Sequence, residues 1–127
     1  MFDEKIGVIG TWHVDVFMHP VDIGLVLLYP DLVNYGLVRY LQEHKVKIIE
    51  IPPAELFPLM GNVGLIEAGK VIVDPAAKET IKALRREGVD CIEVDFSEGA
   101  YAGYGMHCAC CELRRDQPSP TLEEVGR

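Results

Sequence analysis

The stretch VLLYPDLVNYGLVRYLQEHKVKIIEI, residues 26–51, has a second version in VIVDPAAKETIKALRREGVDCIEV, residues 71–94. Each begins with an aliphatic run that leads to a proline, Pro30 or Pro75, and each closes with an alternating run that is typical of a strand. Between the two runs, apolar residues recur at helical spacing. The pattern predicts one β-α-β unit that occurs twice, with about 45 residues between equivalent points.

Neighbouring segments extend each unit by one strand. The stretch NVGLIEAGKVIV, residues 62–73, indicates a hairpin that turns at residues 67–69, and a further strand is expected at residues 5–9. Gly88 lies where a helix C-cap glycine belongs. The apolar positions of the two predicted helices are Leu37, Val38 and Leu41, and Ala77, Ile81 and Leu84. The predicted fold class is therefore α/β (α+β), built from repeated β-β-α-β modules that stack around an axis.

The length and composition describe one globular domain. The chain has 127 residues, 49% of them apolar, and a net charge of -8, which disfavours a nucleic-acid partner. Its N-terminus is charged, and no run approaches the roughly 20 apolar residues that a membrane helix needs. The four cysteines do not form the spaced framework of a secreted disulfide scaffold. We therefore expect a cytoplasmic protein that binds neither nucleic acid nor membrane.

The end of the chain differs from the rest in composition. From Asp116 onward the sequence is DQPSPTLEEVGR, which is polar and rich in proline. We expect residues 1–116 to form a partial domain of the repeated modules and residues 117–127 to form a loose C-terminal tail.

The stretch GMHCACCELRRD, residues 105–116, places three cysteines within four positions. A structural zinc site normally uses two spaced pairs of ligands, and the chain has no second pair, although a distant histidine would be available as a further ligand. A disulfide between the adjacent Cys110 and Cys111 would be strained. A small metal-binding protein, inert thiols and one reactive thiol all remain open at this point.

The stretch GTWHVDVF, residues 10–17, contains a histidine and an aspartate two positions apart. If this stretch is extended, His13 and Asp15 project to one face, and Val14 and Val16 point the other way, into a core. The pair is then either a catalytic imidazole and carboxylate or a surface ion pair that contributes less than about 1 kcal/mol.

Taken together, the segments GTWHVDVF and GYGMHCACCELRRD resemble those of the guanidino-group-modifying (pentein) superfamily. That superfamily includes the amidinotransferases, arginine deiminases and dimethylarginine dimethylaminohydrolases. Its members carry a His-x-Asp segment and, near the C-terminus, a glycine-rich His-Cys segment, and NVGLIEAGKVIVD is similar to a strand pair of the family. CELRRD is most similar to the glycine amidinotransferase branch, and the resemblance covers residues 10–116.

The resemblance implies the roles of several residues. Carried over position by position, Cys108 is the nucleophile, His13 is the general acid and base, and Asp15 holds the guanidinium nitrogens. Further residues of the expected pocket are His107, Gly105 and Trp12. No cofactor and no metal are implied, Cys110 and Cys111 need no chemical role, and Cys91 is expected in a strand that faces a core.

The chemistry suits these residue types. A soft thiolate attacks the guanidinium carbon, an amine departs, and a covalent amidino-thioether remains on Cys108. The imidazole protonates the leaving amine and then deprotonates the next nucleophile. With water the enzyme is a hydrolase of the deiminase type, and with a second amine it is an amidinotransferase. The expected partner is thus a small cationic guanidino substrate.

The resemblance also implies that the molecule is incomplete on its own. The family fold is an α/β-propeller of five modules, and this chain is expected to hold about two to two and a half of them. Either the chain is a C-terminal fragment or a reduced relative, or it assembles with copies of itself or with a complementing N-terminal half. Because an open module face is apolar, we expect an assembly, either a homo-oligomer or a complex with that half. The alternative hypothesis is a catalytically silent relative that binds a cationic amine or a protein partner.

Overall fold

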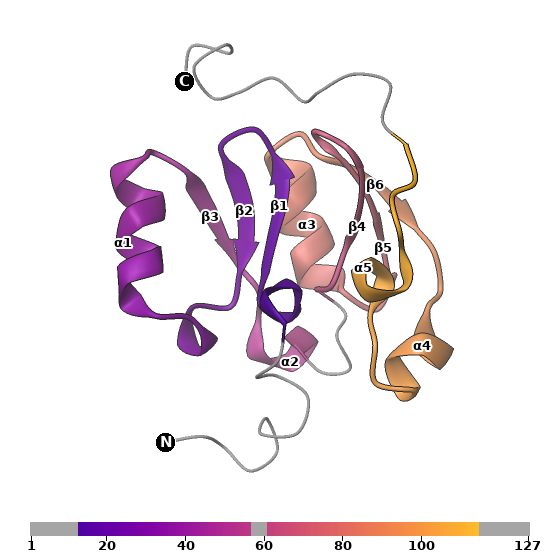
Figure 1. Cartoon of the computed structure of the whole chain (residues 1–127). Coiled ribbons are helices and arrows are strands. Elements are labelled where there is room, and N and C mark those ends of the chain that lie inside the picture. Colours follow the sequence, from indigo (N-terminus) through magenta and orange to yellow (C-terminus); the bar gives the residue numbers. More distant parts are fainter. Residues whose placement is uncertain (1–12, 57–60, 115–127) are drawn as a thin grey trace.

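The computed structural model describes residues 13–56 and 61–114, which form two small sheets and their helices (Figure 1). The first sheet holds β1 (Met18–Asp22), β2 (Leu25–Leu28) and β3 (Lys47–Glu50), with helix α1 (Tyr35–Glu43) between β2 and β3. The second holds β4 (Gly64–Glu67), β5 (Lys70–Val73) and β6 (Asp90–Glu93), with α3 (Lys78–Arg86) between β5 and β6. The shorter elements are the 3-10 turns η1 (Val14–Val16) and η2 (Pro30–Leu32) and the helices α2 (Pro53–Leu56), α4 (Ser97–Tyr101) and α5 (Met106–Ala109).

The two sheets repeat each other in detail. In each, the first two strands are antiparallel and the last two are parallel, and the register shifts at the same point of the hairpin. Each hairpin turns at a glycine with positive φ, Gly24 at 72° and Gly69 at 76°, a conformation that a side chain disfavours. The predicted α/β fold of repeated β-β-α-β modules is confirmed, and two such modules lie within the described residues.

The elements stack as layers in the order α1, first sheet, α3, second sheet (Figure 1). Helix α3 lies between the sheets because it contacts both its own strand β6 and the strand β3 of the other module. Side chains of both sheets and of α3 form one apolar core cluster. Members of this cluster include Leu27, Ile49 and Ile51 from the first module and Val71, Ile81 and Leu84 from the second.

The extended conformation considered for residues 10–17 does not occur in the described part of that stretch. Val14–Val16 form a 3-10 turn, in which the N–H of Val16 donates to the carbonyl of His13 at 3.2 Å. Val14 is 54% exposed, whereas Val16 is buried, so only one of the two valines faces the core. Strand pairing with β2 is assigned from Met18 onward, and the carbonyl of Phe17 just before it accepts from the N–H of Tyr29 at 2.8 Å.

Other predictions fall outside the described ranges. The expected strand at residues 5–9, the residue Trp12 and the tail at residues 117–127 are all among them. Along residues 13–56 and 61–114, no helix combines the length and the apolar character that crossing a membrane requires.

Candidate functional site

Several residues that the sequence predicts for the site lie around one carboxylate, that of Asp15. The η1 turn places Asp15 beside α5, where its Oδ2 lies 2.9 Å from His107 Nδ1 and accepts from Cys108 Sγ at 3.5 Å. The other oxygen, Oδ1, lies 3.9 Å from His13 Nδ1. Residues from the two ends of the described chain, more than ninety positions apart, thus meet at Asp15. The structure brings His13, Asp15, His107 and Cys108 together.

A buried amide, which sequence reasoning missed, holds the two segments in place. Asn62 is only 2% exposed, and its Nδ2 donates to the backbone carbonyl of Asp15 at 2.6 Å. Its Oδ1 accepts from the backbone N–H groups of His107 at 2.8 Å and of Cys108 at 3.3 Å. Asn62 is therefore the link that fixes the carboxylate next to the thiol. The only local signal was a polar residue directly before the apolar run of β4.

Gly105 has a structural place beside this amide. A Cβ at Gly105 would come closer than 3.0 Å to the Asn62 side chain. A glycine there lets the start of α5 approach Asn62 closely enough to form both backbone hydrogen bonds. We therefore place Gly105 beneath the site, where it supports α5.

A buried histidine lies behind His107. His19, on β1, is 2% exposed, and its ring centroid lies 5.8 Å from that of His107 in an edge-on arrangement. Burial, together with the neighbouring His107, lowers the pKa of His19 to about 3. Within the described ranges His19 Nε2 has no hydrogen-bond partner. His19 is therefore neutral at physiological pH.

The pKa shifts at the site follow from the shared carboxylate. Partial burial on its own would raise the pKa of Asp15, but the hydrogen bonds from His107 and Cys108 outweigh burial and lower it. Burial raises the pKa of the Cys108 thiol, and the negative charge of Asp15 raises it further. In this state the thiol is protonated and Asp15 is ionised. A cation that neutralises Asp15 would favour the thiolate.

The remaining cysteines are free thiols in different surroundings. Cys91 lies on β6 in the core cluster, as predicted, and burial raises its pKa. Cys110 and Cys111 are exposed. Across the two described ranges, no group of three or more His, Cys, Asp or Glu side chains is arranged to hold a metal ion.

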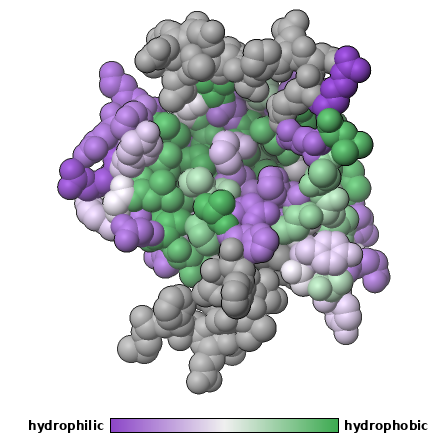
Figure 2. Space-filling model, viewed as in Figure 1, coloured by the Kyte–Doolittle hydropathy of each residue, from purple (hydrophilic) through white to green (hydrophobic). Residues whose placement is uncertain are grey.

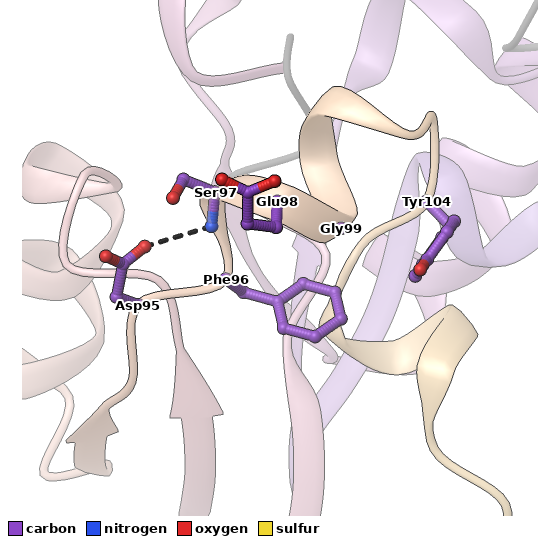
Figure 3. Close-up of a pocket in the computed structure, with 6 residues that line it drawn as sticks. All are labelled: Asp95, Phe96, Ser97, Glu98, Gly99 and Tyr104. Atoms are coloured by element: carbon purple, nitrogen blue, oxygen red, sulfur yellow. Dashed lines mark hydrogen bonds between the residues drawn. The ribbon is translucent and has the colours of Figure 1, made fainter.

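A separate cavity of about 280 Å³ lies beside α4. Figure 3 shows the rings of Phe96 and Tyr104 at this cavity, and the N–H of Ser97 donating to Asp95 at 3.0 Å. Its lining contains none of the residues that meet at Asp15. The cavity is therefore distinct from the candidate site.

Known proteins are similar to this chain over most of its length. The chain is 30% identical over 115 residues to 2-nitroimidazole nitrohydrolase of Mycobacterium sp. (strain JS330), covering 89% of this chain and 30% of the relative. It is 25% identical over 129 residues to the mitochondrial glycine amidinotransferase of Xenopus laevis, covering 89% and 30%. No family model matches the chain.

Solved structures share the fold. A saxitoxin-pathway amidinotransferase from Microseira wollei superposes with a TM-score of 0.71 at 26% identity, covering 88% of this chain and 36% of that one. Other structural neighbours are an arginine dihydrolase from cyanobacteria and a dimethylarginine dimethylaminohydrolase from Pseudomonas aeruginosa. The chain spans about a third of the length of the curated relatives it matches. The chain is therefore a relative of the amidinotransferases of the pentein superfamily, and it shares its fold with an arginine dihydrolase and a dimethylarginine dimethylaminohydrolase.

Proposed function

We propose that this chain carries the catalytic cysteine of an enzyme that modifies guanidino groups, acting as an amidinotransferase or as an amidine hydrolase on arginine-like substrates. Cys108 is the nucleophile, Asp15 binds the guanidinium, and His13 is the general acid and base. The observation that supports this most is the meeting of a thiol and two imidazoles at one ionised carboxylate.

The charge of Asp15 controls when the Cys108 thiol loses its proton. Beside an ionised carboxylate the thiol keeps its proton, so the free protein is a poor nucleophile. A guanidinium that pairs with Asp15 cancels this charge and brings its own positive charge close to Cys108 Sγ. The pKa of the thiol then falls when the substrate is in place, and the thiolate forms next to the carbon that it attacks.

The steps balance as follows. The Cys108 proton passes to an imidazole, the thiolate forms a C–S bond to the guanidinium carbon, and the C–N bond breaks as the imidazolium protonates the departing amine. The imidazole next takes a proton from the incoming nucleophile, which displaces the thiolate. If a small amine leaves and water enters, the product is a ureido compound. If the alkyl amine leaves and another amine enters, the amidino group is transferred.

His107 is a second candidate for the imidazole. Its Nδ1 lies 2.9 Å from Asp15 Oδ2, against 3.9 Å between His13 Nδ1 and Asp15 Oδ1. The His13 side chain is 75% exposed, which leaves it free to meet a substrate, whereas His107 is tied to Asp15 and packs on His19. We assign proton transfer to His13 and the orientation of Asp15 to His107.

Covalent labelling tests the nucleophile. After incubation with chloroacetamidine, a small amidine electrophile, mass spectrometry should find one adduct, on Cys108. The exposed Cys110 is the matched control, because it lies two positions away and outside hydrogen-bonding contact with Asp15 in the described structure. Labelling spread over Cys108, Cys110 and Cys111 alike would favour a catalytically silent relative.

Turnover tests the assigned roles. Arginine supplied with and without an amine acceptor separates transfer from hydrolysis. Cys108→Ala should abolish turnover and Cys110→Ala should preserve it. His13→Ala should remove the basic group from the pH–rate profile, whereas His107→Ala should mainly raise KM. Equal turnover of the Cys108→Ala and unmodified proteins would contradict the proposal.

A further inference from the structure

The contact between the two modules shows how a helix of one module packs on the sheet of another, and we use it as a template. Ile49 and Ile51, which follow one face of β3, lie in one core cluster with Ile81 and Leu84 of α3. Polar contacts flank the apolar centre. The Glu55 carboxylate accepts from the N–H and the hydroxyl of Thr80 at the start of α3, at 2.9 and 2.6 Å. Near the end of α3, Lys47 Nζ lies 2.7 Å from Glu87 Oε2.

One end of the layered stack presents an uncovered copy of the β3 surface. The strand registers make Ile92 and Val94, on and just after β6, the equivalents of Ile49 and Ile51. Ile49 and Ile51 are 8% and 2% exposed, because α3 covers them, whereas Ile92 and Val94 are 39% and 42% exposed. We call this the β6 face.

The opposite end presents an uncovered copy of the α3 surface. None of the α1 residues is buried, although α1 has the apolar spacing of α3. Leu41 is half-buried where its equivalent Leu84 is 0% exposed, and Tyr40 is 56% exposed. We call this the α1 face. Figure 2 shows the green apolar side chains over the first sheet beside α1, whereas α1 itself, at the edge of this view, is mostly purple.

Polar groups also lie at the ends of the two faces. The positions equivalent to Lys47 and Glu87 are Asp90 on β6 and His44 after α1. The strand then supplies the carboxylate and the segment after the helix supplies an imidazole, so the two side chains can form a hydrogen bond in place of the Lys47–Glu87 ion pair. His44 also stacks on Tyr40, with ring centroids 4.0 Å apart, which holds both rings on the α1 face.

We propose that the α1 face of one copy of this chain packs on the β6 face of a second copy, as α3 packs on β3 within the chain. Both halves of the contact are present in every copy, and each contains uncovered apolar side chains flanked by a polar group that can pair with the other. The proposal rests on packing alone and stands apart from the proposed chemistry.

Helix α1 differs from α3 in two features that bear on the proposed contact. Asn34 Oδ1 already accepts from the N–H of Gly36 at 2.7 Å at the start of α1, so α1 needs no outside carboxylate there. Tyr40 occupies the position of Ala83, which extends the α1 face with an aromatic ring of a kind enriched at interfaces.

The contact is heterologous, because two different surfaces meet. Each copy in such an assembly keeps one free face of each kind, so growth continues until a ring closes. The mass of the unmodified protein should therefore rise with concentration beyond a dimer in light scattering. A clean monomer at high micromolar concentration would overturn the proposal.

Complementary variants give the sharpest test. Tyr40→Glu blocks the α1 face and Ile92→Glu blocks the β6 face, and each variant alone should be monomeric. A 1:1 mixture should form a heterodimer of twice the monomer mass, because each variant keeps the face that the other lacks. Val14→Glu is the matched control, since Val14 is 54% exposed on the η1 turn and lies outside both faces; it should associate like the unmodified protein.

Each outcome is decisive. Circular dichroism of the three variants first establishes that they are folded, which is expected because all three positions are exposed. A mixture that stays monomeric would overturn the proposal, as would association of either single variant to the level of the unmodified chain. Labelling of Cys108 by chloroacetamidine is independent of this result, so failure of the two proposals can be told apart.

Discussion

The two β-β-α-β modules have the same strand order, the same hairpin bulge and the same helix length, yet they differ in what covers them. Helix α3 lies between two sheets and buries Thr80, Ile81 and Leu84, whereas α1 has a sheet on one side only and buries none of its residues. The comparison teaches that burial here is set by position in the stack. The residues that meet at Asp15 come from η1, the loop before β4, and α5, which are the parts outside the repeat.

The largest difference between the modules should appear when equivalent leucines are truncated. Leu84→Ala should lower the free energy of unfolding by between about 2 and 5 kcal/mol, because a fully buried side chain leaves a cavity. Leu41→Ala should cost about 1 kcal/mol, since Leu41 is only half-buried. Urea unfolding measures both values, and equal losses would show that the α1 face is covered as α3 is.

The carboxylates that follow β3 and β6 should differ almost as much. Glu55→Ala leaves two N–H groups and a hydroxyl of α3 without their acceptor, which should cost roughly 2 kcal/mol in the free energy of unfolding. Glu98→Ala, at the equivalent position in α4, should change stability by less than about 0.5 kcal/mol. Thermal unfolding at matched pH compares the two variants. A similar loss of stability in both would contradict the view that Glu55, and not Glu98, holds the start of a packed helix.

Acid should destabilise the first module through His19, which stands where the second module has Gly64. The pKa of His19 is lowered from 6.5 to about 3, so stability is complete above pH 6.5 and falls as pH decreases toward 3. The slope should be about 1.4 kcal/mol per pH unit, or about 2 kcal/mol between pH 6.5 and 5.0. His19→Phe should flatten this part of the urea stability curve. An unchanged slope would mean that His19 is already charged.

The smallest effect concerns the residues that follow the two helices. Gly88 has a φ of 84°, and Lys45, its equivalent after α1, has a φ of 57°, where a side chain is disfavoured. Lys45→Gly should therefore stabilise the protein by about 0.5 to 1 kcal/mol, and Gly88→Lys should destabilise it by a similar amount. Paired urea titrations measure both changes, which should have opposite signs.

Local sequence patterns predicted the repeated parts of the fold and fewer of the parts that form the site. Helical spacing and the glycine turn of the second hairpin are local properties, so both helices and that hairpin could be predicted. The burial of Leu84 and the exposure of Leu41 could not, because the two have the same spacing and differ only in their neighbours across the stack. Asn62 was missed because its partners lie more than forty positions away on both sides.

The η1 turn shows the same limit at the site itself. Alternation would place His13 and Asp15 on one face if the stretch were a strand, but Val14–Val16 form a 3-10 turn. The two side chains still lie 3.9 Å apart, for a different reason from the one predicted.

The most direct test of the account is the pKa of the Cys108 thiol with and without the carboxylate of Asp15. In a background of Cys110→Ser and Cys111→Ser, the rate of alkylation by iodoacetamide is followed against pH for Cys108 with Asp15 and with Asp15→Asn. Because the charge of Asp15 raises the pKa of the thiol, the substitution should lower that pKa and speed labelling at neutral pH. Identical titration curves for the two proteins would mean that the carboxylate and the thiol are not neighbours.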